Sequence, residues 1–269
     1  MKTVKHLAEF GGTTHFDAFK AAVAFLKKNS GSTLEIPPKT YTLSGGISKK
    51  LQSAVMTGKE YSADMFNRGI SVTGLKDCEI RGNGAVILAD GFMQTLYLRD
   101  CKNIVISDLK LGFVRPPYSV GTVISCEDKK DTSSLKIDFG LKFPLNENSP
   151  VKRAFMITEG NETAIKTENL KITSAFGAEL EIKHDADYLG AVVCVIHAEN
   201  LLDTIRIENC KNIALKNVTV FAGSGRAIYA QNTDGLDIST ALFIPPIGEQ
   251  RCLSRQDITL INCKNIKTK

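Results

Sequence analysis

The sequence predicts an all-β fold in which the coils of a parallel β-helix stack on one another. Two observations carry this prediction. The phrase Cys-Lys-Asn-Ile occurs three times, beginning at Cys101, Cys210 and Cys263. Its first two copies run on into stretches that alternate apolar and polar residues, at 104–111 and 213–220. A recurring turn followed by a strand of period two is the signature of a β-helix coil.

The spacing of the repeats gives the length of a coil. Cys101 follows Cys78 by 23 residues, and a degenerate copy of the phrase at Thr233 follows Cys210 by the same interval. One coil of that length cannot bury its own apolar face, so several coils must stack. Equivalent residues of neighbouring coils then lie roughly 4.8 Å apart. We therefore expect the cysteines to form an interior ladder of free thiols and the asparagines to form an amide ladder at the turn.

The segments outside the repeats predict a cap and an insertion. Thr14 and Asp17 resemble a capping box, and apolar residues follow at helical spacing to about Lys28, which indicates a cap helix over the open end of the coils. The interval from Cys101 to Cys210 is 109 residues and contains strands at hairpin-like spacings, which predict an inserted antiparallel β-barrel subdomain. The expected domains are residues 1–118 with the cap helix and first coils, 119–204 with the insertion, and 205–269 with the continuing coils.

Composition and charge exclude several classes of function. The net charge is +5 and the pI about 8.7, but the 34 basic residues are spread among 29 acidic ones rather than gathered in the basic stripe of a nucleic-acid-binding protein. No apolar run is long enough to span a membrane, and residues 1–6 are not followed by the apolar core of a signal peptide. The seven cysteines include neither a Cys-x-x-Cys pair nor a Cys/His spacing typical of a metal site. We expect no metal and no cofactor.

Several phrases together resemble a known family. Residues 16–22 and 36–41 resemble the entry segment of the pectate-lyase-like superfamily of right-handed parallel β-helices. The phrase Arg-Pro-Pro-Tyr-Ser-Val-Gly at 115–121 resembles the one that leads into an inserted β-barrel in the α-1,3-galactosidases of glycoside hydrolase family 110, and residues 223–231 and 253–257 follow in the order of that family. The resemblance implies a right-handed helix. It also implies a secreted or periplasmic enzyme that removes terminal α-linked galactose from an oligo- or polysaccharide with inversion and without a metal.

The same resemblance implies a catalytic residue. Inverting hydrolysis uses two carboxyl groups, roughly 6.5–9.5 Å apart, one as acid and one as base. Asp257 matches the position of one family carboxylate, and a turn aspartate that binds backbone amides is the structural alternative. The family's further carboxylates, in a Gly-Asp-Asp phrase about one coil later, are absent from the 12 residues that follow Asp257. We therefore expect the chain to be either the N-terminal part of such an enzyme or a shortened relative. A homodimer or a second chain could supply the absent carboxylates across an open C-terminal edge.

Five residues are candidate substrate ligands, and each has a structural alternative. Arg226, in a turn at a coil edge, and Gln231, in phase with it, could bind sugar hydroxyls; a surface ion pair and an amide ladder are the alternatives. Tyr118 could stack on a sugar ring beside Arg115, or both could pack at the exit from the coil. His197 could take part in acid–base chemistry, or it could be structural.

Three functions stay open on the sequence alone. The first is a glycoside hydrolase that resembles an inverting α-1,3-galactosidase. The second is a non-catalytic β-helix that binds glycans or has a structural role, which the incomplete set of acids favours. The third is a polysaccharide lyase, by analogy of fold alone. Substitution of Asp257 discriminates between the first two, because an enzyme loses turnover and a binding module keeps its affinity.

Overall fold

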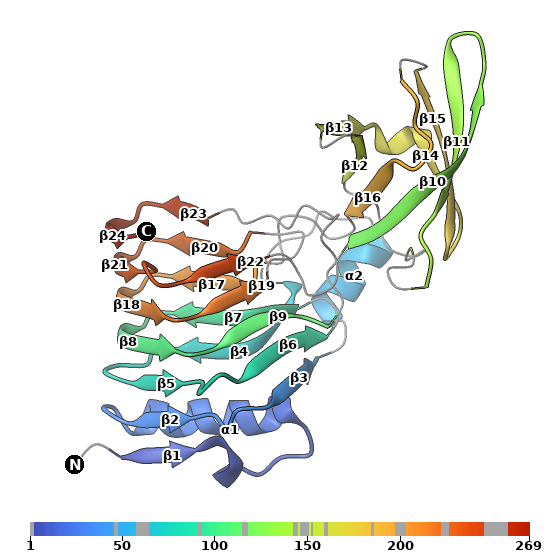
Figure 1. Cartoon of the computed structure of the whole chain (residues 1–269). Helices are drawn as coiled ribbons and strands as arrows, with labels where there is room; N and C mark the ends of the chain where they lie inside the picture. The colour runs from blue at the N-terminus through green and yellow to red at the C-terminus, as the bar shows by residue number, and fades with distance from the viewer. Residues whose placement is uncertain are drawn as a thin grey trace. The chain divides into compact units, whose positions relative to one another are not determined.

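The structure is a computed structural model that divides into two compact units, both built mainly of β-strands (Figure 1). It describes residues 3–45, 48–57, 65–90, 93–114, 118–141, 145, 151, 153–158, 161–183, 186–196, 203–221, 226–244 and 258–269. The first unit contains residues 1–114, 200–250 and 254–269, and the second contains residues 115–199 and 251–253. The dominance of strands confirms the predicted all-β class.

Parallel strands of the first unit form three sheets, as the coil pattern predicts. Sheet A has the order β1-β2-β5-β8-β18-β21-β24 and consists of Val4–His6, Thr33–Glu35, Glu79–Arg81, Lys102–Ser107, Lys211–Lys216, Asp234–Asp237 and Lys264–Lys267. Sheet B has the order β22-β19-β9-β6-β3 and consists of Leu242–Ile244, Thr219–Phe221, Lys110–Phe113, Val86–Asp90 and Thr40–Ser44. Sheet C has the order β23-β20-β17-β7-β4 and consists of Ile258–Ile261, Ile228–Gln231, Ile205–Glu208, Met93–Arg99 and Asn67–Thr73.

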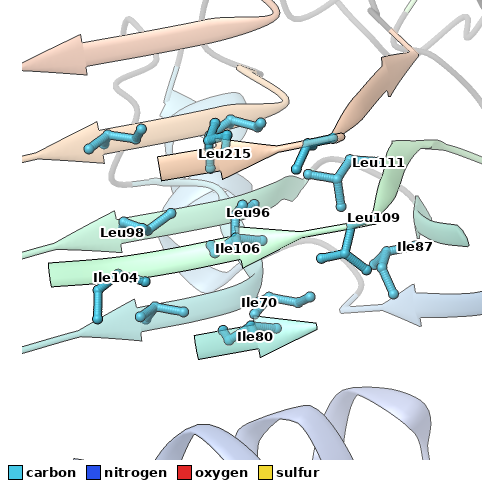
Figure 2. Packing of buried hydrophobic residues seen from close by; sticks show 14 of the residues in the cluster. Ile70, Ile80, Ile87, Leu96, Leu98, Ile104, Ile106, Leu109, Leu111 and Leu215 are labelled. Atoms are coloured by element: carbon cyan, nitrogen blue, oxygen red, sulfur yellow. The ribbon is translucent and has the colours of Figure 1, made fainter. Parts of the chain in front are cut away.

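The chain visits the three sheets in a fixed rotation. From β4 it passes through sheets C, A and B in turn, and each round adds one parallel strand to each sheet (Figure 1). Alternate side chains of these strands point inward and share one core (Figure 2). Ile80 on β5 pairs in register with Ile106 on β8, which pairs in register with Leu215 on β18, and all three are buried. Stacked apolar rows of this kind complete the core that one coil cannot bury alone.

The predicted amide ladder is present at the turns. The Nδ2 group of Asn212 donates a hydrogen bond to Oδ1 of Asn103 at 2.9 Å, and Nδ2 of Asn232 donates to Oδ1 of Asn209 at 3.1 Å. Each of these residues has a φ between 50° and 54°, in the left-handed region. Asparagine tolerates that region better than most other residues with a Cβ atom, because its short side-chain amide can form hydrogen bonds with the nearby backbone. The repeated Asn therefore sets both the turn and the stacking of the coils.

The cysteine ladder is interior as predicted, except at Cys263, which is only partly buried. Cys78, Cys101 and Cys210 are buried and carry free thiols, and the backbone N–H of Cys101 donates to Sγ of Cys210 at 3.4 Å. Burial raises the pKa of the Cys78 thiol. A buried thiol with a raised pKa behaves as a small apolar side chain rather than as a nucleophile.

Two α-helices and a short 3₁₀ helix lie in the described part of the first unit. The predicted cap helix is α1, His15–Lys28. Its start is fixed by a reciprocal capping box, in which the Asp17 backbone N–H donates to Thr14 Oγ1 at 3.1 Å and the Thr14 backbone N–H donates to Asp17 Oδ2 at 3.2 Å. Phe19, Ala22 and Leu26 of α1 join the core of the coils. The second helix, α2 (Lys49–Thr57), and the short 3₁₀ helix Leu7–Glu9 were not predicted.

The second unit is one antiparallel sheet, sheet D, as the hairpin-like spacings predict. Its order is β13-β12-β16-β10-β11-β15-β14, and its strands are Asn161–Ile165, Arg153–Thr158, Val192–Ile196, Tyr118–Asp128, Thr132–Asp138, Gly177–Lys183 and Leu170–Ser174. A 3₁₀ helix, Thr167–Asn169, connects β13 to β14. Within the described residues β13 and β14 stand at the two ends of the strand order, so a closed barrel is not seen in that part of the chain.

Two further observations concern surfaces. The last strands of the three sheets, β22, β23 and β24, leave apolar side chains exposed, among them Leu242, Ile244 and Leu260.

In the part of the chain that the structure describes, no helix is both long enough and apolar enough to span a membrane.

Candidate functional site

The outward face of sheet C carries a cluster of arginines, tyrosines and carboxylates, which we call the Arg–Tyr cluster. Its members are Arg68, Tyr97, Arg99, Asp203, Arg206, Glu208, Arg226, Tyr229 and Gln231. The register of the sheet brings the central members together. Arg206 on β17 pairs with Tyr97 on β7 and with Tyr229 on β20, and Glu208 pairs with Arg99 and Gln231. Their neighbours in sequence point into the core, so alternation sends these side chains outward.

Asp203 organises two of the arginines. Its side chain is 0% exposed, and it accepts hydrogen bonds from Arg226 Nε at 2.7 Å, Arg226 Nη2 at 3.3 Å and Arg206 Nη1 at 3.1 Å. Burial raises the pKa of Asp203, and the bonds from Arg226 and Arg206 oppose that shift. Both carboxylate oxygens are occupied. Asp203 therefore holds the two guanidinium groups in fixed orientations.

Glu208 is the carboxylate of the cluster with access to solvent, since its side chain is 19% exposed. Its Oε1 accepts a hydrogen bond from Arg206 Nε at 2.7 Å, and its Oε2 accepts one from the Tyr97 hydroxyl at 2.7 Å. Burial alone would raise the pKa of Glu208, but the hydrogen bonds from Tyr97 and Arg206 outweigh it, and the net pKa is lowered. Glu208 is therefore an ionised acceptor at neutral pH.

The tyrosines and arginines stack on one another. The Arg68 guanidinium lies 3.7 Å from the centroid of the Tyr97 ring, and the guanidinium groups of Arg206 and Arg226 lie 4.2 and 4.3 Å from the centroid of Tyr229. These are cation–π distances. The Tyr229 hydroxyl donates to Gln231 Oε1 at 2.8 Å. The result is a preorganised polar surface with arginine and amide donors beside a carboxylate acceptor.

Three of the predicted site residues lie in the described part of the chain. For Arg226 the structural alternative to sugar binding was a surface ion pair. Arg226 does form an ion pair, but its partner, Asp203, is buried rather than at the surface. Gln231 is half-buried on β20 and reaches the same tyrosine as Arg226. Tyr118 begins β10 in the second unit, and its side chain is 2% exposed among Val120, Phe155, Cys194 and Ile196. A buried ring fits the packing alternative for Tyr118 rather than a stacking surface for a sugar.

The other predicted site residues, Arg115, His197 and Asp257, lie outside the described residues. In the part of the chain that the structure describes, no group of three or more His, Cys, Asp or Glu side chains is arranged to hold a metal ion.

Most members of the cluster were not predicted from the sequence. Arg206 and Glu208 occupy the polar positions of the alternating stretch Ile205–Glu208, and Tyr229 follows Arg206 by the coil interval of 23 residues. That interval is the signal that could have placed Arg206 beside Tyr229. The pattern of one coil alone does not reveal the cluster, because Tyr97, Arg206 and Tyr229 come from different coils.

Comparisons with known proteins add a partial similarity. No family model matches the chain. Over 126 residues, or 44% of its length, the chain is 26% identical to α-1,3-galactosidase A of Bacteroides fragilis strain ATCC 25285 and 25% identical to the protein of the same name from strain YCH46. The match spans 21% of the length of each relative. A crystal structure of a candidate glycosyl hydrolase from Parabacteroides merdae aligns with 97% of this chain and 95% of its own, at a TM-score of 0.42 and 12% identity.

Proposed function

We propose that this chain is a carbohydrate-active protein of the glycoside hydrolase type, and that it binds a glycan on the outward face of sheet C. The observation that carries the proposal is the Arg–Tyr cluster, in which an ionised Glu208, the guanidinium donors of Arg206 and Arg226 and the amide of Gln231 share one face. Sugar hydroxyls both donate and accept hydrogen bonds, so a face with fixed donors and acceptors suits them. The partial similarity to α-1,3-galactosidase A supports the same class of ligand.

The finer proposal is an inverting α-1,3-galactosidase that acts on terminal α-linked galactose. Such a reaction needs a base that is ionised and an acid that is protonated. Glu208 suits the base, because its pKa is lowered and its side chain is partly exposed. Asp257, which precedes β23 by one residue in the sequence, is proposed as the acid. Asp203 then acts as a positioning residue, because it holds Arg206 and Arg226.

We also propose that the coils wind in the right-handed sense of the pectate-lyase-like superfamily. The rotation of the chain through sheets C, A and B supports coils of this kind. Crossovers between parallel strands of one sheet are right-handed in about 98% of cases, which supports the hand.

A calorimetric titration with galactosyl-α-1,3-galactose tests the binding face. Substitution Gln231→Ala removes one amide and is expected to weaken binding by about three- to tenfold, the value of one neutral hydrogen bond. Arg81→Gln is the matched control, because Arg81 lies on sheet A, where it pairs with Glu79. Arg81→Gln should bind the disaccharide as the unchanged chain does. The proposal is wrong if the disaccharide does not bind, or if Gln231→Ala binds it as tightly as Arg81→Gln does.

A non-catalytic glycan-binding protein is the second candidate. One observation favours it: every oxygen of Asp203 and Glu208 already accepts a hydrogen bond. Turnover separates the two candidates: an enzyme hydrolyses the disaccharide and loses that activity in Glu208→Gln, whereas a binding protein binds the disaccharide without hydrolysing it. A polysaccharide lyase stays the third candidate and rests on fold analogy alone.

Self-association through β22, β23 and β24 is a further part of the proposal. These strands leave edge positions and apolar side chains exposed, and exposed edges favour pairing with another chain. Sedimentation velocity of the chain at rising concentration tests it: a constant sedimentation coefficient of a monomer would rule self-association out.

A further inference from the structure

The Arg–Tyr cluster has more positive than negative charge. Asp203 and Glu208 accept four hydrogen bonds from Arg206 and Arg226 and one from Tyr97, and these bonds use both oxygens of each carboxylate. Two arginines, Arg68 and Arg99, are left on the same face. Among the described residues, Arg68 makes no ion pair and no hydrogen bond, and its described partner is the Tyr97 ring at 3.7 Å.

Arg99 is the second cation. Its Nε lies 3.4 Å from Oδ2 of Asp100, and its side chain is 49% exposed. Arg99 also interacts with the Tyr97 hydroxyl. Arg68 stacks on the face of Tyr97 and Arg99 lies at its hydroxyl end, so one tyrosine side chain bridges the two guanidinium groups. Glu208 interacts electrostatically with both Arg68 and Arg99, and Arg99 also pairs with Asp100, so four guanidinium groups share three carboxylates. An added anion would offset the positive charge that remains.

We propose that the glycan bound at this face carries an oxyanion, and that Arg68 and Arg99 bind it. This inference rests on the proposed function, because it names the chemistry of the ligand at the same site. Guanidinium groups bind oxyanions through two parallel N–H donors, which gives them both strength and a fixed geometry. A sulfate ester and a uronate carboxylate share this chemistry. Glu208 accepts its hydrogen bonds from Arg206 and Tyr97, so its carboxylate offsets the charge of Arg68 and Arg99 only in part.

The test is a set of calorimetric titrations of the whole chain with matched probes. The probes are galactosyl-α-1,3-galactose, the same disaccharide with one sulfate ester, the same disaccharide with a carboxylate at C6 of one ring, and inorganic sulfate alone. We expect at least one charged disaccharide to bind about tenfold or more tightly than the neutral one, which is the value of a charge-assisted hydrogen bond. We also expect this preference to shrink as the salt concentration rises.

Variants identify the residues. Arg68→Gln should reduce the ratio of the affinity for the charged disaccharide to that for the neutral one about tenfold, and Arg68→Lys should keep part of this preference because it keeps the charge without the planar fork. Arg99→Gln should act in the same direction, and Arg81→Gln on sheet A should leave the preference unchanged. Lys and Gln substitutions at a stacked surface position keep the aliphatic stem, so the folded chain can be checked by circular dichroism before each titration.

The outcomes separate this inference from the proposed function. Equal affinities for neutral and charged disaccharides would overturn the oxyanion inference and leave the glycan face in place. Binding of inorganic sulfate as tight as that of the sulfated disaccharide would overturn it as well, because the ligand would then be a free anion rather than a glycan. The absence of binding by every disaccharide would overturn the proposed function itself. Loss of the preference in Arg81→Gln would place the anion elsewhere and overturn the assignment to Arg68 and Arg99.

Discussion

Replacement of Asp203 by alanine tests the organisation of the Arg–Tyr cluster. The substitution removes a fully buried carboxylate and leaves Arg206 and Arg226 without it. Removal of one partner from a buried ion pair costs about 3–5 kcal/mol of unfolding free energy, because the remaining charge stays desolvated. Two features favour the lower end of that range. The Arg226 side chain is 22% exposed and can recover water, and Arg206 keeps its bond to Glu208. We therefore expect Asp203→Ala to destabilise the first unit by about 3 kcal/mol.

Urea unfolding followed by far-ultraviolet circular dichroism measures this loss. With a slope of about 2–3 kcal/mol per molar urea, the midpoint should fall by about 1 M or more. Because the chain has no tryptophan and two tyrosines belong to the cluster, tyrosine fluorescence gives a second, local probe of the same unit. Arg81→Gln, which breaks the more exposed ion pair with Glu79, serves as the control and should leave the midpoint almost unchanged. A loss below about 1 kcal/mol in Asp203→Ala would refute the reasoning, because that is the value of an exposed pair.

Three other predictions concern the turn ladder, the cap helix and pH. Asn212→Ala should lower the free energy of unfolding by about 2 kcal/mol, because alanine loses the bond to Asn103 and is strained at a φ of 54°. Asn212→Gly loses the same bond without the strain and should lower it by about 1 kcal/mol. Urea unfolding compares the two variants, and equal losses would contradict the strain at this position. Thr14→Ala should cost about 1 kcal/mol through loss of the N-cap, and thermal unfolding with no shift would contradict it. The pKa of Glu208 is lowered on folding from its ordinary value of 4.5, so its contribution to stability is complete above that pH and is lost as the pH falls through the folded-state pKa. The difference in unfolding free energy between the unchanged chain and Glu208→Gln should therefore shrink in acid. A difference that grows in acid would contradict a lowered pKa for Glu208.

The repeats were predictable because they are local. The phrase at Cys101 and Cys210 determines a turn, the strand that follows it, and the position of both within the stack. Asn103 and Asn212 then meet as a ladder, since in-register parallel stacking puts like residues together. The N-terminal helix was predictable for the same reason, because a capping box and apolar spacing need only one segment.

The cluster on sheet C was less predictable because it is assembled across coils. Tyr97 and Arg206 are 109 residues apart, the same interval that separates Cys101 from Cys210, so the cysteine register alone would have paired them. The burial of Asp203 has no such signal. Its role depends on two arginines, Arg206 on β17 and Arg226, which is 23 residues from Asp203 in the sequence.

The most direct test of the proposed function is a proton NMR time course of galactosyl-α-1,3-galactose with the chain. We expect release of galactose that appears first as the β-anomer, because an inverting enzyme reverses the configuration at the α-linkage. The rate should fall by at least a hundredfold in Glu208→Gln and in Asp257→Asn, the effect expected for loss of a general acid or base. No release of galactose at high protein concentration would contradict the hydrolase proposal, and release of the α-anomer first would contradict inversion.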